Sequence, residues 1–462
     1  MKTLSIARLV ALSLTLGTAY CNFAGAAESI DADNLDPDNM FGVALVGGST
    51  LEDFYTAALE YSPRLRIAEE NLNIGSARVR AANGQLLPQL SATASVSDNR
   101  RQTGPSDQNF DGDRYSLQLT QTLFSWQTFA GRKRAYASED QSEAEYFSEL
   151  ASVLTDVTDR YLNVLQSEDA LRLIQSEFEA VSNQLEQVES LYERQLTQIT
   201  DLYQTQASLA AVRAEQLQLE SQLQISRQAL RSATGLEPVT LYRLRSDIEI
   251  AEVEQGMGYW TRLAQQSNYE IQAREYALKA SKELVSERRG VYLPEVSLVV
   301  QRQNTNVGFD NAPLPKTDIT YVGINVSVPL FAGGSNRAAV SEAASMQSIA
   351  ENELRQIKLD VTERVRTAHL QLQNSQLQTQ AAQSLVESAT LSATAMQRGF
   401  ELGTVTSVDV LNAIRNQYQA ERDLQQTKYN HIRFLLELKR EAGVLTAEDL
   451  VEVGSWLESP VN

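Results

Sequence analysis

The chain contains the same plan twice, and this internal duplication constrains its fold more than any other feature of the sequence. Four markers recur in the same order, 206 to 208 residues apart: Leu87-Pro88 with Leu293-Pro294, Leu123-Phe124 with Leu330-Phe331, Asp201 with Asp409, and Gly235 with Gly443. Each copy is predicted to hold a helix, a strand hairpin, a long helix, a turn and a shorter helix. The chain is therefore expected to build one structure from two similar halves.

The boundaries follow from these markers and from the chain's first residues. Six segments are predicted: a signal peptide (1–26), an extended leader (27–48), a first repeat (49–238, with its hairpin at 88–124 and its turn at 192–201), a connector (239–258), a second repeat (259–443, with its hairpin at 294–331 and its turn at 400–409) and an acidic C-terminal tail (444–462). An apolar run followed by Ala24-Gly25-Ala26 is the pattern of a cleaved secretory signal. Cys21, the only cysteine, would be removed with it. Tyr20 precedes this cysteine where a lipoprotein signal needs a small residue.

Long helices are predicted in the middle of both copies. Apolar residues at helical spacing indicate helices over about 128–195 and 335–401, each roughly 100 Å long. The helices before and after them have about half that length, so two short helices stacked end to end match one long helix. A capping box at 49–52 is predicted to start the first helix, with a restart at Pro63. The second copy is predicted to open with one helix over 259–289, and Ser407 to be the N-cap of its last helix.

The hairpins are predicted to have one apolar and one polar face. Apolar and polar residues alternate with the period of a strand, and the apolar set includes Leu90, Ala92, Ala94 and Val96, then Val322, Ile324 and Val326. Polar loops are predicted at 97–112 and 304–316. Four strands are too few to close into a membrane barrel, and their open edges need partners. Three subunits would supply twelve strands and twelve helical columns.

Charge and composition argue against several functions. Without the signal peptide, 38 of the 40 basic residues remain against 59 acidic ones, a net charge of −21. Nucleic acid is not an expected partner, because its phosphates need a basic face. His369 and His431 have no partner at metal-ligand spacing, and no nucleophile, phosphate-binding or dinucleotide motif occurs. No catalytic residue, metal or cofactor is therefore predicted, and no apolar segment after the signal is long enough to predict a transmembrane helix.

The second turn carries the most specific motif. It reads Phe400-x-x-Gly403-Thr404, followed by Asp409-Val410-Leu411 and Ala413. With the duplicated Leu-Pro and Leu-Phe markers, it makes residues 49–445 resemble the TolC family of trimeric outer-membrane efflux ducts. The resemblance implies a mainly α-helical homotrimer with a twelve-stranded β-barrel in outer-membrane lipid and a long α-helical barrel through the periplasm. It also implies a mixed belt at the waist, formed by residues 236–258 and the C-terminal tail.

The same resemblance implies a gate at the helix tips. Asp409 matches a position in the ring of aspartates that narrows the family's tunnel, and Asp201, Asn412 and Phe400 are expected at the same gate. Relatives often have a second aspartate where this chain has Asn412, so the ring would hold three carboxylates rather than six. Phe400 lacks the hydroxyl of the tyrosine in some relatives, so a hydrogen bond from it to Asp201 is excluded. Both aspartates also fit ordinary helix starts, where the helix dipole favours a carboxylate.

The resemblance further implies partners and contact residues. A periplasmic adaptor, recruited with an inner-membrane pump or ABC exporter, is expected to dock at both tips, through Leu402, Gly403, Thr404, Gln195 and Leu196. Gln195 departs from the motif, because its counterpart is a glycine. Aromatic residues expected at the membrane interface are Tyr115, Trp126 and Tyr321, and Trp126 fits packing at the junction of strand and helix equally well.

Two hypotheses of different classes account for these features. The first is a passive exit duct of a tripartite efflux or type I secretion system, which carries drugs or proteins and opens by outward rotation of the tip hairpins. The alternative is a periplasmic coiled-coil scaffold. It explains the helices, but it leaves the apolar faces of the hairpins in water.

Overall fold

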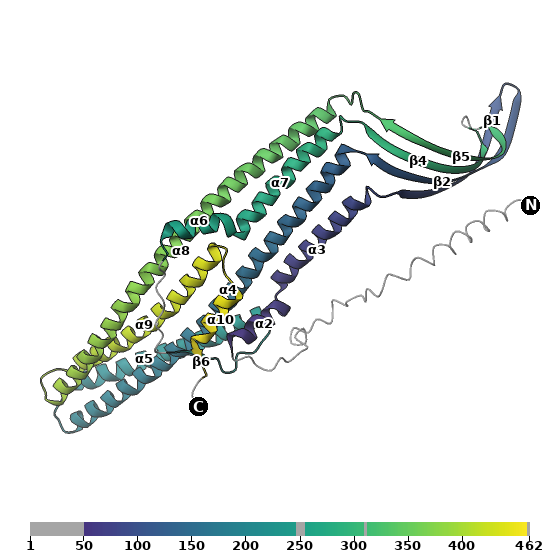
Figure 1. Ribbon diagram of the computed structural model, residues 1–462. Coiled ribbons are helices and arrows are strands. Elements are labelled where there is room, and N and C mark those ends of the chain that lie inside the picture. The colour runs from purple at the N-terminus through teal and green to yellow at the C-terminus, as the bar shows by residue number, and fades with distance from the viewer. Residues whose placement is uncertain (1–49, 246–254, 309–311, 460–462) are drawn as a thin grey trace, which may run out of the picture. The chain divides into compact units, whose positions relative to one another are not determined.

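The structure, a computed structural model, describes residues 50–245, 255–308 and 312–459, all of which belong to the unit Val46–Asn462 (Figure 1). The predicted signal peptide and leader lie outside the described residues. The first copy of the repeat comprises α2 (Leu51–Tyr61), α3 (Pro63–Gly84), β1 (Gln89–Thr103), β2 (Ser106–Phe124), α4 (Trp126–Glu193) and α5 (Ile199–Thr234). The second comprises α6 (Met257–Ser267), α7 (Tyr269–Gly290), β4 (Glu295–Val307), β5 (Pro313–Ser327), α8 (Ser335–Glu401) and α9 (Ser407–Glu441). The connector and the C-terminal segment add β3 (Arg243–Leu244), α10 (Ala447–Ser455) and β6 (Leu457–Glu458).

Two uninterrupted helices organise the helical part. α4 has 68 residues and α8 has 67, and each is therefore roughly 100 Å long. α4 packs against α3 and α5, and α8 packs against α7 and α9, so shorter helices lie along each long one as predicted. The two copies meet because α4 also contacts α7 and α9.

The columns of shorter helices are interrupted at matching points. Pro63 is the first residue of α3, and only Ser62 separates it from the end of α2, so the predicted restart is confirmed. The single helix predicted over 259–289 is wrong, because Asn268 separates α6 from α7. The Asn268 side chain accepts a hydrogen bond from the Ile271 amide and donates one to the Glu441 carbonyl. No proline marks this break, and Asn268 both caps α7 and holds the end of α9.

Gly235 and Gly443 allow a helix end to approach these breaks closely. Both have left-handed backbones, with φ of +74° and +71°. A Cβ on Gly443 would lie 2.4 Å from the Ser267 carbonyl oxygen, and one on Gly235 would lie 3.1 Å from the ring of Tyr61. The same glycine position in both copies therefore joins α5 to the end of α2, and α9 to the end of α6.

Two predicted helix starts are shifted by one residue. Thr50, not Ser49, caps α2, and its capping box is completed by Asp53. Thr406, not Ser407, caps α9, and Asp409 completes that box. In both boxes the threonine hydroxyl accepts from the amide three residues later, and the aspartate accepts from the threonine amide. Asp therefore takes the role usually given to Glu or Gln.

The two hairpins join in one antiparallel sheet with the order β1-β2-β4-β5. One row across the sheet is apolar and consists of Leu90, Leu119, Val300 and Val322. The next row points to the opposite face and consists of Ser91, Gln118, Gln301 and Tyr321. Within the described residues, β1 and β5 pair on one side only. The sheet therefore has one apolar face, one polar face and two free edges.

The polar loops predicted at 97–112 and 304–316 are wrong, because the strands continue through most of both segments. β1 and β2 pair as far as the turn at Gly104-Pro105, and β4 and β5 extend to Val307 and Pro313. Ion pairs join Arg100 to Asp107 and Arg302 to Asp318 across the two hairpins. The first pair lies inside the segment 97–112 and the second flanks 304–316, and opposite charges across a strand pair support pairing. A prediction from alternation therefore ends these strands too early.

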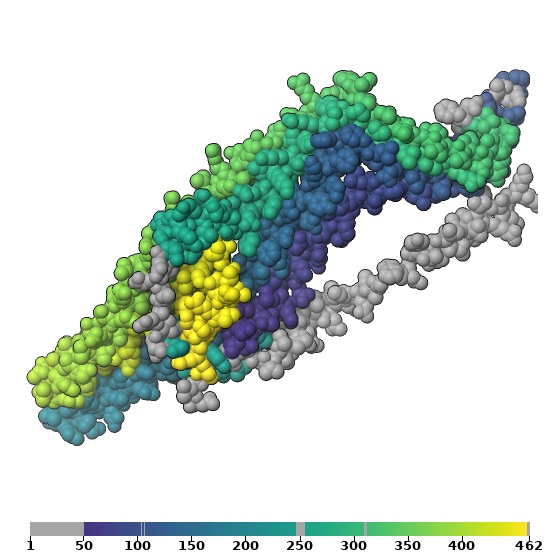
Figure 2. Space-filling model, viewed as in Figure 1, coloured from purple at the N-terminus to yellow at the C-terminus, as the bar shows by residue number. Residues whose placement is uncertain are grey.

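The segment predicted as an acidic tail is folded. β6 pairs with β3 of the connector, and α10 contacts α2 (Figure 2). Leu450 and Val453 of α10 are buried in the cluster that contains Phe54 and Tyr161. Apolar residues at every third or fourth position of this short acidic segment thus hold it against both copies.

We expect Gly443→Ala to destabilise the protein much more than Gly333→Ala. Both glycines have positive φ, +71° and +60°, which costs an alanine about 1 kcal/mol. Only at Gly443 would the new methyl group meet backbone atoms, since nothing lies within 4 Å of a Cβ on Gly333. Overpacking should add about 1–3 kcal/mol, seen as a lower midpoint of thermal unfolding by circular dichroism. An equal fall in the unfolding midpoint for both variants would contradict the close approach at Gly443.

Candidate functional site: the helix tips

The turns after α4 and α8 have the same backbone structure. In the first, the Gln195 amide donates to the Tyr192 carbonyl and the Leu196 amide to the Leu191 carbonyl. In the second, Gly403 and Thr404 donate to Phe400 and Gly399 with the same spacing. Gln195 has a φ of +62° and Gly403 one of +72°. The missing glycine therefore leaves the turn unchanged, and Gln195 is the only non-glycine residue with positive φ in the described part of the chain.

The apex of each tip is apolar and exposed. Leu196 is 69% exposed and Leu402 is 80% exposed. Thr404 is exposed too, but its hydroxyl donates to the Gly399 carbonyl at 2.9 Å and so closes the turn. All five residues predicted for docking thus lie within the two turns or at their edges, and two leucines supply the apolar surface.

Asp409 begins α9 and is exposed. Its carboxylate accepts from the Thr406 amide at 3.0 Å and from the Thr406 hydroxyl at 2.7 Å. These bonds, the hydroxyl first, lower the pKa of the Asp409 carboxyl. Asn412 follows on the same helix, three residues later, and is also exposed. The tip therefore carries a fixed, ionised carboxylate with a neutral amide one turn away.

The other two residues predicted for the gate lie in different surroundings. Asp201 is half-buried, and its carboxylate accepts from the Thr197 hydroxyl at 2.7 Å within the first tip. Phe400 packs with Val405 against a buried cluster. That cluster contains residues of both copies: Ile174, Val181, Val212, Val410, Leu411 and Ile414. Phe400 thus belongs to the packing that joins the tips.

A buried polar junction joins the two tips to each other. Ser407, Thr205 and Gln184 are each at most 2% exposed. The hydroxyl groups of Thr205 and Ser407 lie 3.2 Å apart, and Gln184 Nε2 lies 3.5 Å from Ser407 Oγ. Residue patterns did not predict this junction. The available signal was polar residues at helix positions where apolar ones would be expected.

A buried ion pair lies further from the tips. Arg422 of α9 donates to Glu177 of α4 at 2.9 Å, and their side chains are 14% and 3% exposed. Arg422 also approaches Glu215 of α5 at 3.7 Å. Burial raises the pKa of Glu177, and the Arg422 guanidinium opposes that shift. One arginine therefore ties the second copy to two helices of the first.

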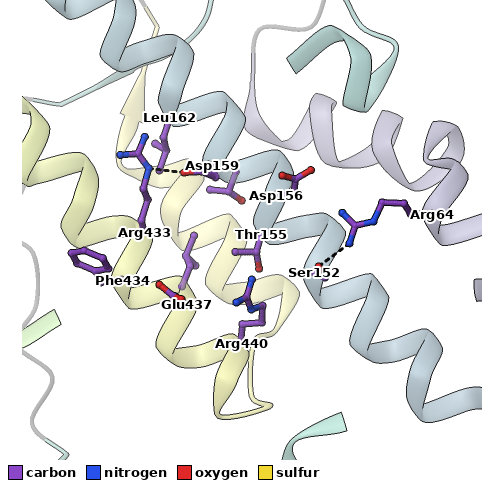
Figure 3. Close-up of a pocket in the computed structure, with 12 residues that line it drawn as sticks. Arg64, Ser152, Thr155, Asp156, Asp159, Leu162, Arg433, Phe434, Glu437 and Arg440 are labelled. Atoms are coloured by element: carbon purple, nitrogen blue, oxygen red, sulfur yellow. Dashed lines mark hydrogen bonds and ion pairs between the residues drawn. The ribbon is translucent and has the colours of Figure 1, made fainter. Parts of the chain in front are cut away.

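A charged cleft of about 350 Å³ lies between the middle of α4 and the C-terminal part of α9 (Figure 3). Arg433 of α9 reaches across it and donates to Asp159 of α4 at 2.6 Å. Its other nitrogens donate to Asn163 and Gln166. The cleft thus lies at the contact between the two copies. The Arg433 guanidinium inside it already donates to three side chains of α4.

The three predicted interface aromatics do not share one environment. Tyr115 is on the same face as Leu119 but pairs with Asn304, and Tyr321 is on the opposite face, beside Gln301. Trp126 donates from Nε1 to Ser286 of α7 at 3.1 Å and still remains 42% exposed. Trp126 therefore packs at the junction of strand and helix, and part of its ring remains exposed to solvent.

The two histidines are buried packing residues. His431 Nδ1 lies 2.8 Å from the Ser375 hydroxyl, and burial lowers the pKa of both His369 and His431. Within the described ranges, no three His, Cys, Asp or Glu side chains are placed to hold a metal ion. No helix in those ranges combines the length and the apolar character needed to cross a membrane.

Comparisons with known proteins identify the family. A family model described as outer membrane efflux protein matches residues 54–236 and 260–444. The chain is 26% identical over 417 residues to outer membrane protein TolC of Vibrio cholerae, covering 89% of this chain and 95% of that protein. It is 25% identical over 411 residues to alkaline protease secretion protein AprF of Pseudomonas aeruginosa, covering 87% and 85%.

Solved structures agree on the fold. The outer-membrane channel OprN matches with a TM-score of 0.76 at 20% identity, over 88% of this chain and 92% of OprN. VceC of Vibrio cholerae matches with a TM-score of 0.75 at 19% identity, over 85% and 96%. The chain therefore belongs to the outer membrane efflux protein family. It is an outer-membrane protein, an exit duct of the efflux or secretion kind.

We expect Gln195→Gly to stabilise the chain by up to about 1 kcal/mol, because it removes left-handed strain from a non-glycine residue. Gly403→Gln should cost a similar amount, since the second turn has the same hydrogen bonds. The midpoint of thermal unfolding measures both changes. Gln198→Gly is the matched control: its φ is −84°, so glycine relieves nothing there. A stabilisation as large in this control would rule out strain at Gln195.

Proposed function

We propose that three copies of this chain form one tunnel. Each copy contributes four strands to a twelve-stranded barrel in the outer membrane, and its helices form a barrel through the periplasm. The observation that carries the proposal is the sheet, because its apolar face is exposed and its two edges are free. Pairing β5 of one copy with β1 of the next would satisfy both edges, and lipid would cover the apolar face. A periplasmic scaffold would neither pair the free edges nor cover the apolar face.

We further propose that the tips form the gate. Three copies of Asp409 would make a ring of three carboxylates, and their capping bonds keep them ionised and in a fixed position. Asn412 would place a neutral amide one helical turn after Asp409. Asp201 would support the first tip through Thr197, and Phe400 would support the second through the apolar cluster. Opening would rotate the hairpin of α8 and α9 away from α4 and α5. That movement has to break the junction at Ser407 and the ion pair between Arg422 and Glu177.

The same tips are the proposed docking site of a periplasmic adaptor. Leu196 and Leu402 present apolar surface from equivalent turns, and Gly403, Thr404 and Gln195 shape those turns. Exposed leucines on a rigid turn suit a partner with an apolar groove. An inner-membrane pump or ABC exporter would recruit the adaptor and supply the energy, while the duct itself stays passive.

Planar-bilayer recordings test the duct and its gate together. The wild-type protein should conduct, and divalent cations added on the tip side should block the current. Asp409→Asn keeps a hydrogen-bond acceptor for Thr406 but removes the ring charge, so we expect block to weaken at least about tenfold, or 1.4 kcal/mol. Because the pKa of Asp409 is lowered, block should persist as the pH falls and be lost only below the ordinary aspartate range.

Asp53→Asn is the matched control, because Asp53 completes an equivalent capping box with Thr50 at the start of α2. Its block should equal that of the wild type. Unchanged block in Asp409→Asn would exclude Asp409 from the gate. A wild-type protein that never conducts would overturn the duct.

Docking is tested by replacing a tip leucine with a charge. Leu402→Glu should reduce crosslinking of a cysteine at position 404 to the adaptor about tenfold or more in cells, because a carboxylate would be buried in an apolar groove. Folding should be unaffected, since the side chain is 80% exposed. Val451→Glu on α10, at a residue 61% exposed, is the control and should crosslink normally. Equal crosslinking in both variants would move the docking site elsewhere. The captured adaptor would show whether the system handles drugs or proteins.

A further inference from the structure

An aromatic cleft lies where β2 passes into α4. It has a volume of about 580 Å³ and is lined by Phe124, Trp126, Phe129, Arg132, Lys133 and Tyr136. The rings of Phe124 and Phe129 meet edge to face with centroids 6.2 Å apart. The Arg132 guanidinium lies 5.5 Å from the ring centroid of Tyr136. The cleft is therefore apolar at its strand end and cationic one to two turns into the helix.

The cleft continues the apolar face of the sheet. The pairing of β2 with β4 shifts between Thr122 and Phe124, so that Leu123 is an extra residue and Phe124 pairs with Val296. This bulge places Phe124 on the side of Val296, Leu298 and Leu119, rather than with the polar residues that its number alone would suggest. The face between Leu119 and the cleft carries one polar side chain, Gln121, whose amide donates to the Leu86 carbonyl, beside Leu298 and Val296.

The chain itself covers both flanks of the cleft. Trp126 hydrogen-bonds to Ser286 of α7, and Asn83 of α3 donates to the hydroxyl of Tyr136 at 3.2 Å. α4 lies between α3 and α7, so a neighbouring copy that extends the sheet at its free edges would meet the outer elements instead. The cleft therefore stays open in the proposed oligomer.

The charge around the cleft is opposite to that of the whole chain. The chain has a net charge of −19, yet no acidic residue lies between Arg114 and Glu139. Arg132 and Lys133 make no ion pair within the described ranges. The helix ends nearest the sheet add further cations: Arg78 and Arg80 in α3, Arg288 and Arg289 in α7, and Arg337 in α8. Glu287, which pairs with Arg134, and Glu295 at the start of β4 are acidic residues of the same boundary, and the cations outnumber them. The boundary between sheet and helices thus has a basic excess that suits an anionic surface.

We propose that this cleft binds the headgroup of an anionic phospholipid of the periplasmic leaflet. The acyl chains would lie on the apolar sheet face, the aromatic rings would contact the glycerol region, and Arg132 and Lys133 would bind the phosphate. Arg132 lies six residues into α4, or about 9 Å along the helix, a depth that suits the headgroup layer. The inference rests on the membrane placement of the sheet in the proposed function.

Native mass spectrometry of the full-length protein in detergent tests the site. Phosphatidylglycerol, phosphatidylcholine and inorganic phosphate are titrated separately. We expect one phosphatidylglycerol retained per chain, and about tenfold weaker retention in the double variant Arg132→Gln/Lys133→Gln. Arg355→Gln/Arg366→Gln removes two exposed charges from α8, away from the cleft, and should bind as the wild type does. Arg132→Lys/Lys133→Arg should restore most of the binding.

Several outcomes would overturn the proposal. Equal losses in both double-glutamine variants would mean only diffuse attraction to a basic surface. Equal retention of phosphatidylcholine would remove the anionic preference, and displacement by inorganic phosphate would leave an anion site without a lipid. Conductance separates the two proposals. If the protein conducts but retains no lipid, only the lipid site is overturned. If it retains lipid but never conducts, the lipid site stands and the duct is overturned.

Discussion

The structure depends on the close approach of one helix end to the break between two others. Gly443 meets the Ser267 carbonyl, and Gly235 meets the ring of Tyr61, with no space for a side chain at Gly443 and little at Gly235. This contact lets α2 and α3 with α5, and α6 and α7 with α9, extend along single helices of 68 and 67 residues. Without it, the long helices would lack neighbours over part of their length. Asn268 reinforces the contact by bonding to the last carbonyl of α9.

The long helices carry two very different ends. At one end, the sheet exposes an apolar face whose only favourable surroundings are lipid or other apolar surface. At the other, two turns are held together by Ser407, Thr205 and Gln184 and expose only their apical leucines. The cleft around Arg433 and the ion pair of Arg422 lie between these ends. The tips are therefore joined both by polar contacts and by the apolar cluster around Val410 and Ile414, whereas the cluster that contains Phe54 and Tyr161 is mainly apolar.

Residue patterns predicted much of this architecture because they record local physics. The helical period set the limits of α8 to the residue, and Pro63 marked the restart of α3. The same patterns failed where the cause lay elsewhere in the chain. Asn268 bonds to the Glu441 carbonyl as well as capping α7, and the strands through 97–112 and 304–316 are held by pairing with the opposite strand. Phe124 lies on the apolar face only because of a β-bulge, which the residue pattern does not predict.

By itself, the sequence determined the duplication, the order of the elements, the amphipathic faces of the hairpins and the position of both tips, since each follows from the spacing of residues along the chain. Only the tertiary structure decided which groups meet across the two copies. It showed that Gln195 adopts the turn of Gly403, that Ser407 meets Thr205, and that Phe400 packs inside the tip cluster. These outcomes depend on backbone geometry and on residues some 200 positions away, which spacing alone does not encode.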